Sequence, residues 1–359
     1  MDSIILLILY SLYSFLLGFM LHKYLISSTQ KYNLKKANIT GIRWETQTKP
    51  LFGGIAFFSL FIFGIINYVV LFKGDIIMNE KSVGIILVAT IAFLIGLADD
   101  LLNSSPIFKS LAQFACALLL INFDIYIDIF ETPLLNYLLT ILWVVGIMNS
   151  INMLDNMDAI TSSVSLLIFI AIVFLVALSA ETTKWFYLFI LISAITGVGS
   201  FLIFNWHPSK TYMGDSGSMF LGILLAIFGI LFLWNIPTGH TNHALIMPGV
   251  ITWLIFTVPI TDTIVVSVNR VLKGQSPFVG GRDHTTHFLS YLGFKDSQVA
   301  WIMIGITFIS ICLAGWLIFS VQSPSLIQLC CFAAWPITIL IVMFIITRTV
   351  KPKVRKPNA

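Results

Sequence analysis

Charged side chains are scarce in this sequence. Asp, Glu, Lys and Arg make up only 10% of the 359 residues, whereas soluble domains carry about a quarter. Hydrophobic residues account for 58% of the chain, and so much apolar surface finds enough burial only in lipid. The composition therefore excludes a soluble globular domain, and the small net charge of +4 gives no reason to expect a nucleic acid partner.

Cysteine is rare, and none of the four cysteines indicates a metal site. Cys116, Cys312, Cys330 and Cys331 all lie inside apolar runs, without the spacing of metal ligands, so we interpret them as small hydrophobic residues. The first apolar run also lacks the basic start of a cleavable signal peptide, and a basic loop follows it instead. We therefore expect this run to be a first membrane span.

Eleven apolar runs are long enough to cross a bilayer as helices, which takes about 20 residues for about 30 Å of hydrocarbon. We predict spans at residues 3–21, 52–72, 83–98, 108–123, 134–149, 159–179, 185–204, 217–235, 246–268, 297–320 and 325–347. The third, fourth and fifth runs are short, so ten spans are the alternative count. The sequence thus predicts an all-α polytopic membrane protein, with one transmembrane helical domain over residues 1–347 and a basic cytoplasmic tail over residues 348–359.

The distribution of Lys and Arg predicts the orientation in the membrane. If the first helix runs from outside to inside, 17 of the 20 Lys and Arg residues fall on the inner side, and only Lys73, Lys81 and Lys184 stay outside. Cytoplasmic loops carry an excess of positive charge. We therefore expect the N-terminus outside and the C-terminus in the cytoplasm.

Four polar islands lie at the ends of apolar runs, all on the predicted cytoplasmic side. The first contains Asp99, Asp100 and Asn103, with Asp99 and Asn103 four residues apart on one helical face. Adjacent carboxylates near lipid are costly unless a cation or water compensates them. They are candidates for Mg²⁺ ligands or for a base acting on a phosphate, and two solvated interfacial acids are the alternative.

The second island has Asn149, Asn152, Asp155 and Asp158 at a constant spacing of three residues. On a helix or a 3₁₀ turn this spacing makes one polar stripe, which suits a sugar, a base edge or a metal ion. The alternative is a water-facing loop in which Asp158 caps the next helix.

The third island carries a single acid, Asp215, at the predicted start of a helix. A helix N-terminus attracts anions, and a carboxylate there would repel a phosphate unless a divalent cation lies between them. We therefore interpret Asp215 as a Mg²⁺ ligand, with a plain N-cap as the alternative. Lys210 is a candidate phosphate donor, Tyr212 offers an aromatic face to a base, and Asn205 ends the preceding helix.

The fourth island contains Arg282, His284 and His287. Histidines three residues apart can share a helical face, and with Arg282 they form a cationic patch suited to a diphosphate; a basic juxtamembrane loop is the alternative. Zinc is a weaker interpretation because thiol ligands are absent nearby. Two further candidates are Lys49, close before a Gly-Gly pair, and Asp262, an acid within the ninth span for which a structural ion pair is the alternative.

Taken in order, these islands resemble the motifs of the polyprenyl-phosphate N-acetylhexosamine-1-phosphate transferase family. Residues 99–103 resemble the paired-Asp motif of that family, and residues 149–158 resemble its Asn/Asp motif. Residues 204–218 resemble its most specific motif. Residues 284–287 resemble its His loop, and residues 49–54 resemble its early Pro/Gly-Gly motif. The resemblance extends from about residue 45 to residue 292, and four islands in the correct order make coincidence improbable.

The sequence departs from the family pattern at a few positions. Asn156 and Ala159 stand where glycine usually follows each acid of the second motif, and Lys49 and Leu51 stand where threonine is common. The His loop lacks the run of adjacent histidines found in the peptidoglycan branch. This difference and the eleven spans favour the branch of undecaprenyl-phosphate GlcNAc-1-phosphate transferases, with phospho-MurNAc-pentapeptide transferase as the alternative.

The resemblance implies an enzyme of the bacterial inner membrane. Such an enzyme transfers a phospho-N-acetylhexosamine, here GlcNAc-1-phosphate, from a UDP-sugar to undecaprenyl or another polyprenyl phosphate and releases UMP, as the first membrane step of a cell-envelope glycan. It implies Mg²⁺ as the cofactor, with Mn²⁺ as an alternative ion. UDP-N-acetylhexosamine, polyprenyl phosphate and the bilayer are the implied partners, and a homodimer is left open.

The resemblance also implies roles for the candidate residues. Asp215, Asp99 and Asp100 would hold the metal ion, or one Asp of the pair would orient or deprotonate the lipid phosphate; a covalent phosphosugar on an Asp is the competing route. His284 and His287 would stabilise the diphosphate charge. The implied substrate-binding residues are Lys49, Asn103, Asn149, Asn152, Asp155, Asp158, Asn205, Lys210, Tyr212 and Arg282.

An ion-coupled transporter is the alternative from another class, because intramembrane acids can relay ions. The acids of this chain gather at one predicted face instead of following a path through the bilayer, which argues against transport. An assembly scaffold is a third reading, and it would give the islands no reason to match the family motifs.

Overall fold

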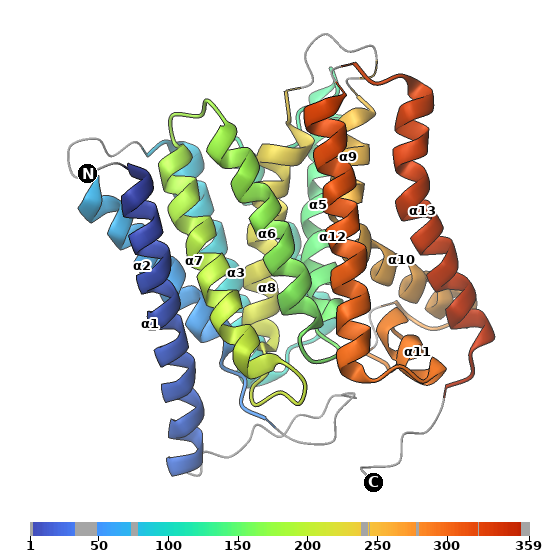
Figure 1. The fold of residues 1–359 in the computed structure, drawn as a ribbon, viewed down its shortest axis with the longest axis horizontal. Coiled ribbons are helices and arrows are strands. Elements are labelled where there is room, and N and C mark those ends of the chain that lie inside the picture. The colour runs from blue at the N-terminus through green and yellow to red at the C-terminus, as the bar shows by residue number, and fades with distance from the viewer. Residues whose placement is uncertain are drawn as a thin grey trace.

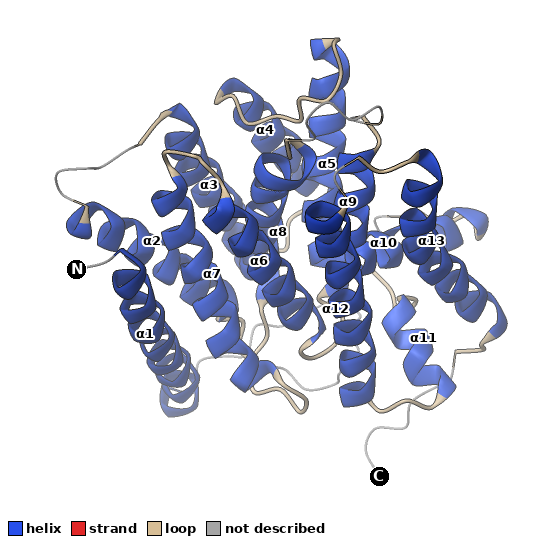
Figure 2. Ribbon diagram, turned by 45° about the horizontal axis from the view of Figure 1, so that its top comes forward, coloured by secondary structure: helices blue, strands red, loops and turns tan. Residues whose placement is uncertain are grey.

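The computed structural model describes residues 3–32, 49–72, 78–237, 243, 245–277, 280–321 and 323–352. Over these residues the fold is built of helices and connecting loops (Figure 2). In chain order the helices are α1 (Ser3–Tyr32), α2 (Gly53–Leu71), α3 (Glu80–Leu102), α4 (Pro106–Asn122), α5 (Pro133–Leu154), α6 (Ile160–Leu178), α7 (Lys184–Asn205), α8 (Gly214–Gly229), the π-helical η1 (Ile230–Trp234), α9 (Met247–Ile255), α10 (Thr257–Leu272), α11 (Thr285–Leu292), α12 (Asp296–Ser320) and α13 (Leu326–Thr349).

The helices confirm the prediction of an all-α polytopic membrane protein. Within the described ranges, nine helices are long and apolar enough to span a membrane, and the count is ten if α9 and α10, which are bent by 84°, form one span. The 17-residue α4 coincides with the fourth predicted run but is a shorter apolar helix. The structure is therefore consistent with the alternative count of ten spans, and α4 is a shorter apolar helix at the position of the fourth predicted run.

The ninth predicted span is wrong as a single straight helix. Helix α9 ends before Phe256, and α10 starts at Thr257 in a new direction. Pro259 falls in the first turn of α10, where its missing N–H leaves no hydrogen bond unmade. Hydropathy cannot reveal this break, because apolar residues continue on both sides of it.

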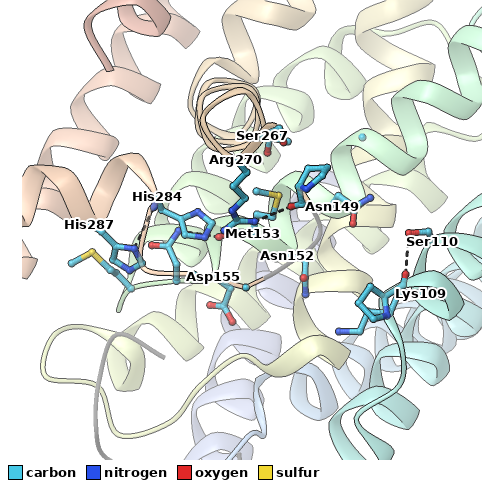
Figure 3. Close-up of a pocket in the computed structure, with 18 of the residues that line it drawn as sticks. Lys109, Ser110, Asn149, Asn152, Met153, Asp155, Ser267, Arg270, His284 and His287 are labelled. Atoms are coloured by element: carbon cyan, nitrogen blue, oxygen red, sulfur yellow. Dashed lines mark hydrogen bonds between the residues drawn. The ribbon is translucent and has the colours of Figure 1, made fainter. Parts of the chain in front are cut away.

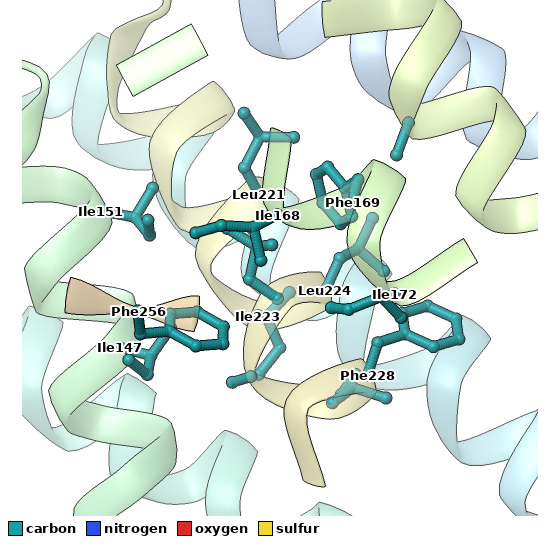
Figure 4. Close-up of a cluster of buried hydrophobic side chains, with 14 of the residues drawn as sticks. Ile147, Ile151, Ile168, Phe169, Ile172, Leu221, Ile223, Leu224, Phe228 and Phe256 are labelled. Atoms are coloured by element: carbon teal, nitrogen blue, oxygen red, sulfur yellow. The ribbon is translucent and has the colours of Figure 1, made fainter. Parts of the chain in front are cut away.

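Helix α8 is the centre of the bundle. Figure 4 shows Leu221, Leu224 and Phe228 of α8 among side chains of α5 and α6, and 94% of the span formed by α8 and η1 is buried. A helix that is apolar on every side is stable only when other helices or lipid surround it. Helices α2, α3 and α5 pack against α8, whereas only 17% of the α1 and α13 spans is buried.

The polar islands meet at one end of the bundle. In Figure 1, α1 begins at the upper end and α13 ends at the lower end, where α11 and the connection from α7 to α8 also lie. The end of α3 meets the start of α8, since the Asp100 carboxylate accepts hydrogen bonds from Ser216. This arrangement gathers segments that are far apart in the sequence into one region.

A tight turn between α3 and α4 returns a lysine to the acids at the end of α3. Asn103 follows α3 with a φ of 52°, a left-handed conformation that asparagine tolerates. Ser105 caps α4 with its side chain, and Pro106 occupies the first turn, where its N–H is not needed. Lys109 in that first turn therefore faces Asp99.

Candidate active site

A cavity of about 900 Å³ opens among the polar islands. Its volume is that of a small-molecule site. Figure 3 shows its lining, which combines cations, amides, hydroxyls and imidazoles from separate helices, among them Lys109, Ser110, Asn149, Asn152, Asp155, Ser267, Arg270, His284 and His287. Of the other predicted site residues, Asn103, Asp158, Asn205 and Tyr212 also line it.

Asp99 and Asp215 share one cation at the edge of this cavity. The ammonium of Lys109 contacts Oδ2 of Asp99 and lies 3.4 Å from Oδ2 of Asp215. Asp99 is almost fully buried, with 2% of its side chain exposed, whereas 25% of the Lys109 side chain is exposed. Lys109 therefore stands between the two carboxylates and the cavity.

The second oxygen of each carboxylate is held by protein donors. Oδ1 of Asp99 accepts hydrogen bonds from the N–H of Ser104, at 2.8 Å, and from its hydroxyl. Oδ1 of Asp215 accepts from Nδ2 of Asn152 at 2.5 Å. With both Oδ1 atoms engaged, the two Oδ2 atoms are directed at one common position, which the Lys109 ammonium occupies.

Asp100 is oriented away from this pair and caps α8. Its Oδ1 accepts from the N–H of Asp215 at 2.8 Å, and its Oδ2 accepts from the N–H and the hydroxyl of Ser216 at 3.0 and 2.6 Å. These N–H groups carry the partial positive charge of the helix N-terminus. Gly214 permits the approach, since its φ is +77° and a Cβ would lie 2.7 Å from the Asp100 carboxylate.

The cap changes the interpretation of two acids. Asp215 is not the N-cap of α8, because the carboxylate of Asp100 takes the first N–H groups of that helix. Both oxygens of Asp100 are engaged there, so the arrangement favours Asp99 and Asp215 over Asp100 as ligands of a metal ion. The predicted catalytic roles of all three acids stay predictions.

The second island does not form the predicted continuous polar stripe, because α5 ends at Leu154. Asn149 exchanges hydrogen bonds of 2.9 and 3.2 Å with Gln113 of α4, while Asn152 donates to Asp215. Asp155 follows the helix end and lines the cavity. The four residues at a constant spacing therefore take different directions.

Asp158, the last of that island, clamps the connection between α7 and α8. Its carboxylate accepts from the N–H and the hydroxyl of Ser209 at 2.9 and 2.7 Å, and Nδ1 of His207 lies 3.2 Å away. It does not cap α6, because the N-cap is Ala159, with a φ of 66°. Asp158 has 3% of its side chain exposed, so it supports the cavity wall.

Asn205 is a second support for the same connection. Its Oδ1 accepts from the N–H of Ala159 at 3.0 Å, and its Nδ2 donates to the carbonyl of Thr211 at 3.1 Å. Lys210 has an exposed side chain and lies outside the residues that line the cavity. The predicted substrate roles of both residues stay predictions, and the structure gives Asn205 a structural function as well.

Lys49 and Tyr212 form a contact between the early motif and the third island. Nζ of Lys49 lies 5.1 Å from the centroid of the Tyr212 ring and donates to the Ser209 hydroxyl at 3.0 Å. A cation over an aromatic face is attracted by the ring quadrupole. Because Tyr212 lines the cavity, this contact fixes one side of the wall.

Asp262 holds the start of α11 and orients His284. Its Oδ2 lies 2.8 Å from Nδ1 of His284, and its Oδ1 accepts from the N–H and the hydroxyl of Thr285 at 2.9 and 2.6 Å. Asp262 is 1% exposed. The acid within the ninth span is therefore tied to the His loop, and its partner is an imidazole that lines the cavity.

His287 differs from the cationic residue that the sequence predicts. Burial, followed by the neighbouring His284, lowers the pKa of His287 to about 3, so this imidazole is neutral at pH 7. Its Nδ1 accepts a hydrogen bond of 3.4 Å from the N–H of His284. The predicted cationic patch is wrong for His287, because burial of the ring disfavours its charged form.

Arg270 supports the loop that precedes α11. It donates to Asp283 through Nε and Nη2 at 2.8 and 2.7 Å and to the carbonyl of Pro277 through Nη1 at 2.8 Å. Burial by itself would raise the pKa of Asp283, but the Arg270 guanidinium outweighs it and holds that pKa below its usual value. Arg282 lines an adjoining hollow of about 510 Å³ with Arg270 and Lys273.

The predicted Mg²⁺ would have the two Oδ2 atoms as its protein ligands, not a preformed group of three or more acidic, His or Cys side chains. In the part of the chain that the structure describes, no three His, Cys, Asp or Glu side chains come together to hold a metal ion. Mg²⁺ commonly takes one or two carboxylates, keeps several waters and binds substrate phosphates. Asp99 and Asp215 match that donor set, because their Oδ2 atoms already share a cation.

Sequence reasoning missed Lys109, Ser104, Ser209 and the short helix α11. Lys109 sits ten residues after Asp99, beyond a turn, and no periodic pattern connects the two. The one signal was the Ser-Ser-Pro run at residues 104–106, whose helix-start chemistry returns the chain toward the acids. Helix α11 has eight residues, which is too short for an apolar period to stand out.

Comparison with known families and proteins agrees with this geometry. Residues 82–233 match the model of glycosyl transferase family 4, a segment that includes the acids of α3, the second island and Asp215. Over this segment the chain is similar to glycosyl transferase family 4, and its apolar helices are those of a polytopic membrane protein.

The similar proteins are named as transferases of N-acetylglucosamine phosphate for undecaprenyl or decaprenyl phosphate. The chain is 29% identical over 269 residues to a probable undecaprenyl-phosphate N-acetylglucosaminyl 1-phosphate transferase of Bacillus subtilis (72% of this chain, 71% of the relative). It is 27% identical over 271 residues to the undecaprenyl-phosphate alpha-N-acetylglucosaminyl 1-phosphate transferase of Escherichia coli K12 (71% and 68%). It is 28% identical over 230 residues to a decaprenyl-phosphate N-acetylglucosaminephosphotransferase of Mycobacterium leprae (58% of each chain).

Proposed function

We propose that this protein transfers GlcNAc-1-phosphate from UDP-GlcNAc to a polyprenyl phosphate and releases UMP, as the first membrane step of a cell-envelope glycan. The match to the model of glycosyl transferase family 4 supports a transferase, and the names of the relatives support the transferred group and the lipid acceptor. Undecaprenyl phosphate is the acceptor that the first relatives suggest. The UDP donor is inferred from the chemistry, since UMP is the leaving group of such an exchange.

The observation that carries the proposal is the Lys109 ammonium between Asp99 and Asp215 at the edge of the 900 Å³ cavity. A transferase for two phosphate-bearing substrates needs positive charge at a concave site beside acids. An ion relay would need acids along a path through the bilayer, whereas the acids of the four islands gather at one end of the bundle. The site therefore favours transfer over transport.

The chain's own residues divide into two groups in this reaction. Lys109, Arg270 and His284 are placed to receive the negative charge of the diphosphate. Asn149 and Asp155 are placed to hydrogen-bond the sugar or the nucleotide. An oxygen of the lipid phosphate attacks the sugar-bearing phosphorus, the bond from that phosphorus to the UMP oxygen breaks, and a new P–O–P bond links lipid and sugar. Such transfers rest mainly on positioning and charge neutralisation.

A magnesium ion is part of the proposal, with Asp99 and Asp215 as its carboxylate ligands and Mn²⁺ as an alternative ion. Bound there, the ion would neutralise charge that develops on the transferred phosphoryl group. Asp100 would contribute by fixing the start of α8 and with it the position of Asp215.

The membrane orientation also belongs to the proposal. A UDP-sugar is made and kept in the cytoplasm, so we place the cavity on the inner face of a bacterial cell membrane, with α1 starting outside. Of the cations that support this choice, Lys109, Arg270 and Arg282 lie at the cavity end. Part of the predicted inner loop and of the basic tail lies outside the described residues.

A turnover assay tests the proposal. Purified protein in detergent is given UDP-GlcNAc, undecaprenyl phosphate and Mg²⁺, and UMP and the lipid-linked diphosphosugar are measured by mass spectrometry. We expect both products only when all three components are present, and we expect Asp215→Asn to abolish them while Glu181→Gln, an exposed residue, leaves them unchanged. UMP without the lipid product, or faster reaction with UDP-MurNAc-pentapeptide, would contradict the assignment.

A further inference from the structure

The His loop has a second attachment besides Asp262, and it is to the connection between α5 and α6. The hydroxyl of Thr286, in the first turn of α11, donates a hydrogen bond of 2.6 Å to Oδ1 of Asn156, 130 positions away in the sequence. Thr286 is fully buried, so its hydroxyl depends on a protein partner. Asn156 is that partner, and it joins the second island to α11.

The Asn156 side chain has a protein partner at each of its two polar atoms. While Oδ1 accepts from Thr286, Nδ2 donates to the carbonyl of Met153 at 2.9 Å. That carbonyl is among the last four of α5, which have no partner inside the helix. One amide therefore ties the end of α5 to α11, and a residue without an amide at this position could not make both bonds.

This attachment closes a ring of hydrogen bonds among α5, α10 and α11. Ser150 of α5 accepts from the hydroxyl of Thr263 on α10 at 2.9 Å. The neighbouring Asp262 of α10 holds the start of α11, and Thr286 of α11 returns to Asn156, just beyond the end of α5. Without the last of these bonds, α11 would stay joined to α10 but would lose this tie to the second island.

The two residues joined by this bond lie next to groups of the cavity wall. Asp155 directly precedes Asn156, and His284 lies two positions before Thr286. Asp155 and His284 both line the cavity (Figure 3). We propose that Asn156 is a positioning residue that, through Thr286, fixes the separation between Asp155 and the His284 imidazole, so that one donor molecule meets both. Asn156 acts here through Thr286 and not by its own contact with the donor.

The inference rests on the proposed function for what the two groups bind. In that function, His284 receives the charge of the diphosphate, and Asp155 hydrogen-bonds the sugar or the nucleotide of the same molecule. A misplacement of about 1 Å in such an arrangement can cost a factor of about 10². If α11 leaves its place part of the time, the apparent affinity for the donor falls with the fraction of molecules that keep the binding-competent arrangement.

The first measurement needs no substrate. Hydrogen exchange of the purified protein in detergent is followed by mass spectrometry for the unmodified protein, for Asn156→Ala and for Thr286→Val, which lacks the hydroxyl. We expect the amides of α11 to exchange about three- to tenfold faster in both variants, because one hydrogen bond changes a local opening equilibrium by roughly that factor. Exchange in α8 should stay the same. Thr338→Val is the matched control, since that hydroxyl bonds within its own helix α13, and it should leave exchange in α11 unchanged.

The second measurement is the KM of each substrate in the turnover assay. KM for UDP-GlcNAc should rise about three- to tenfold in Asn156→Ala and in Thr286→Val, while KM for undecaprenyl phosphate stays the same, because His284 and Asp155 are assigned to the donor. Thr286→Ser keeps the hydroxyl and should stay within about twofold of the unmodified protein. The double variant should be no worse than either single variant, because both changes remove the same bond. A protein that merely folds less well would lose kcat with both KM values unchanged.

Unchanged exchange in α11, or exchange that rises equally in α11 and α8, would overturn the positioning role. An unchanged KM for UDP-GlcNAc, or an equal rise for both substrates, would overturn it as well. If Asn156→Ala does not fold, Thr286→Val and Thr286→Ser decide the same question. If the unmodified protein shows no turnover, the transferase proposal fails alone, and the exchange measurement still decides whether Asn156 holds α11.

Discussion

The carboxylate of Asp262 and the imidazole of His284 form a buried pair between α10 and the start of α11, with Oδ2 and Nδ1 2.8 Å apart. A carboxylate accepts in this hydrogen bond, so Nδ1 carries the ring proton. The opposite nitrogen, Nε2, is then the one left for the cavity that His284 lines. Asp262 thus sets the orientation of a residue at the site without lining the cavity itself.

Asp262→Asn should lower turnover about 10- to 100-fold, the usual effect of losing the partner that orients a functional imidazole. Without the carboxylate, the preference for a proton on Nδ1 is lost, so the pH profile of kcat should move as well. The measurement is kcat across neutral pH, with Glu80→Gln at the exposed start of α3 as the control. A loss of activity with an unmoved pH profile would mean that Asp262 only stabilises the fold.

Gly214→Ala should destabilise the protein by about 1–3 kcal/mol, because the left-handed backbone resists a side chain. The new Cβ would also lie 2.7 Å from the Asp100 carboxylate and push it off the start of α8. Thermal unfolding in detergent measures the change. Gly305→Ala is the matched control, since its Cβ meets no atom within 4 Å, and it should leave Tm nearly unchanged. Equal Tm values for the two variants would contradict the cap.

Acid should weaken the fold through His287. Its pKa is about 3 in the folded protein because of burial, against about 6.5 in an unfolded chain. Between these values the unfolded chain binds the proton and the folded protein does not, so stability falls as the pH drops below about 6.5. His287→Gln should flatten that part of the curve of Tm against pH. An unchanged slope in the variant would show that other groups cause it.

Asp215→Asn and Asp100→Asn should fail in different ways. Asp215→Asn should lose turnover by a factor of about 10² or more, because a carboxylate for the cation is removed, while Tm stays near that of the unmodified protein. Asp100→Asn should lower both turnover and Tm, since its amide would turn a donor toward the N–H groups of Asp215 and Ser216. Equal Tm losses in both variants would contradict this division of roles.

The helical architecture was predictable because lipid imposes it. Burying backbone polar groups in hydrocarbon forces each apolar run to become a helix, and every predicted run contains a helix in the structure. The bend at Phe256 and the eight-residue α11 were not predictable in this way. Apolar residues continue through the bend, and the start of α11 is held by the contacts of His284 and Thr285 with Asp262, which is distant in the sequence.

The position of the site was predictable, but the partners within it were not. Charge counting places the acids of the four islands on one face, and the structure brings Asp99 and Asp215 to one shared cation. The alternative of Asp215 as an N-cap is wrong, because the carboxylate that caps α8 is Asp100, which comes from another helix and has no local sequence signal. The spacing of Asn149 to Asp158 also misled, since a helix end inside the run breaks the period.

The burial of α8 has a consequence for how the protein tolerates different bilayers. With 94% of the α8 and η1 span enclosed, Asp215 stands on a column that scarcely touches acyl chains. The peripheral α1 and α13, which are 17% buried, meet the hydrocarbon and can tilt when its thickness changes. Shorter or longer lipids should therefore strain the rim of the molecule first, while the spacing between the carboxylates at its axis is maintained.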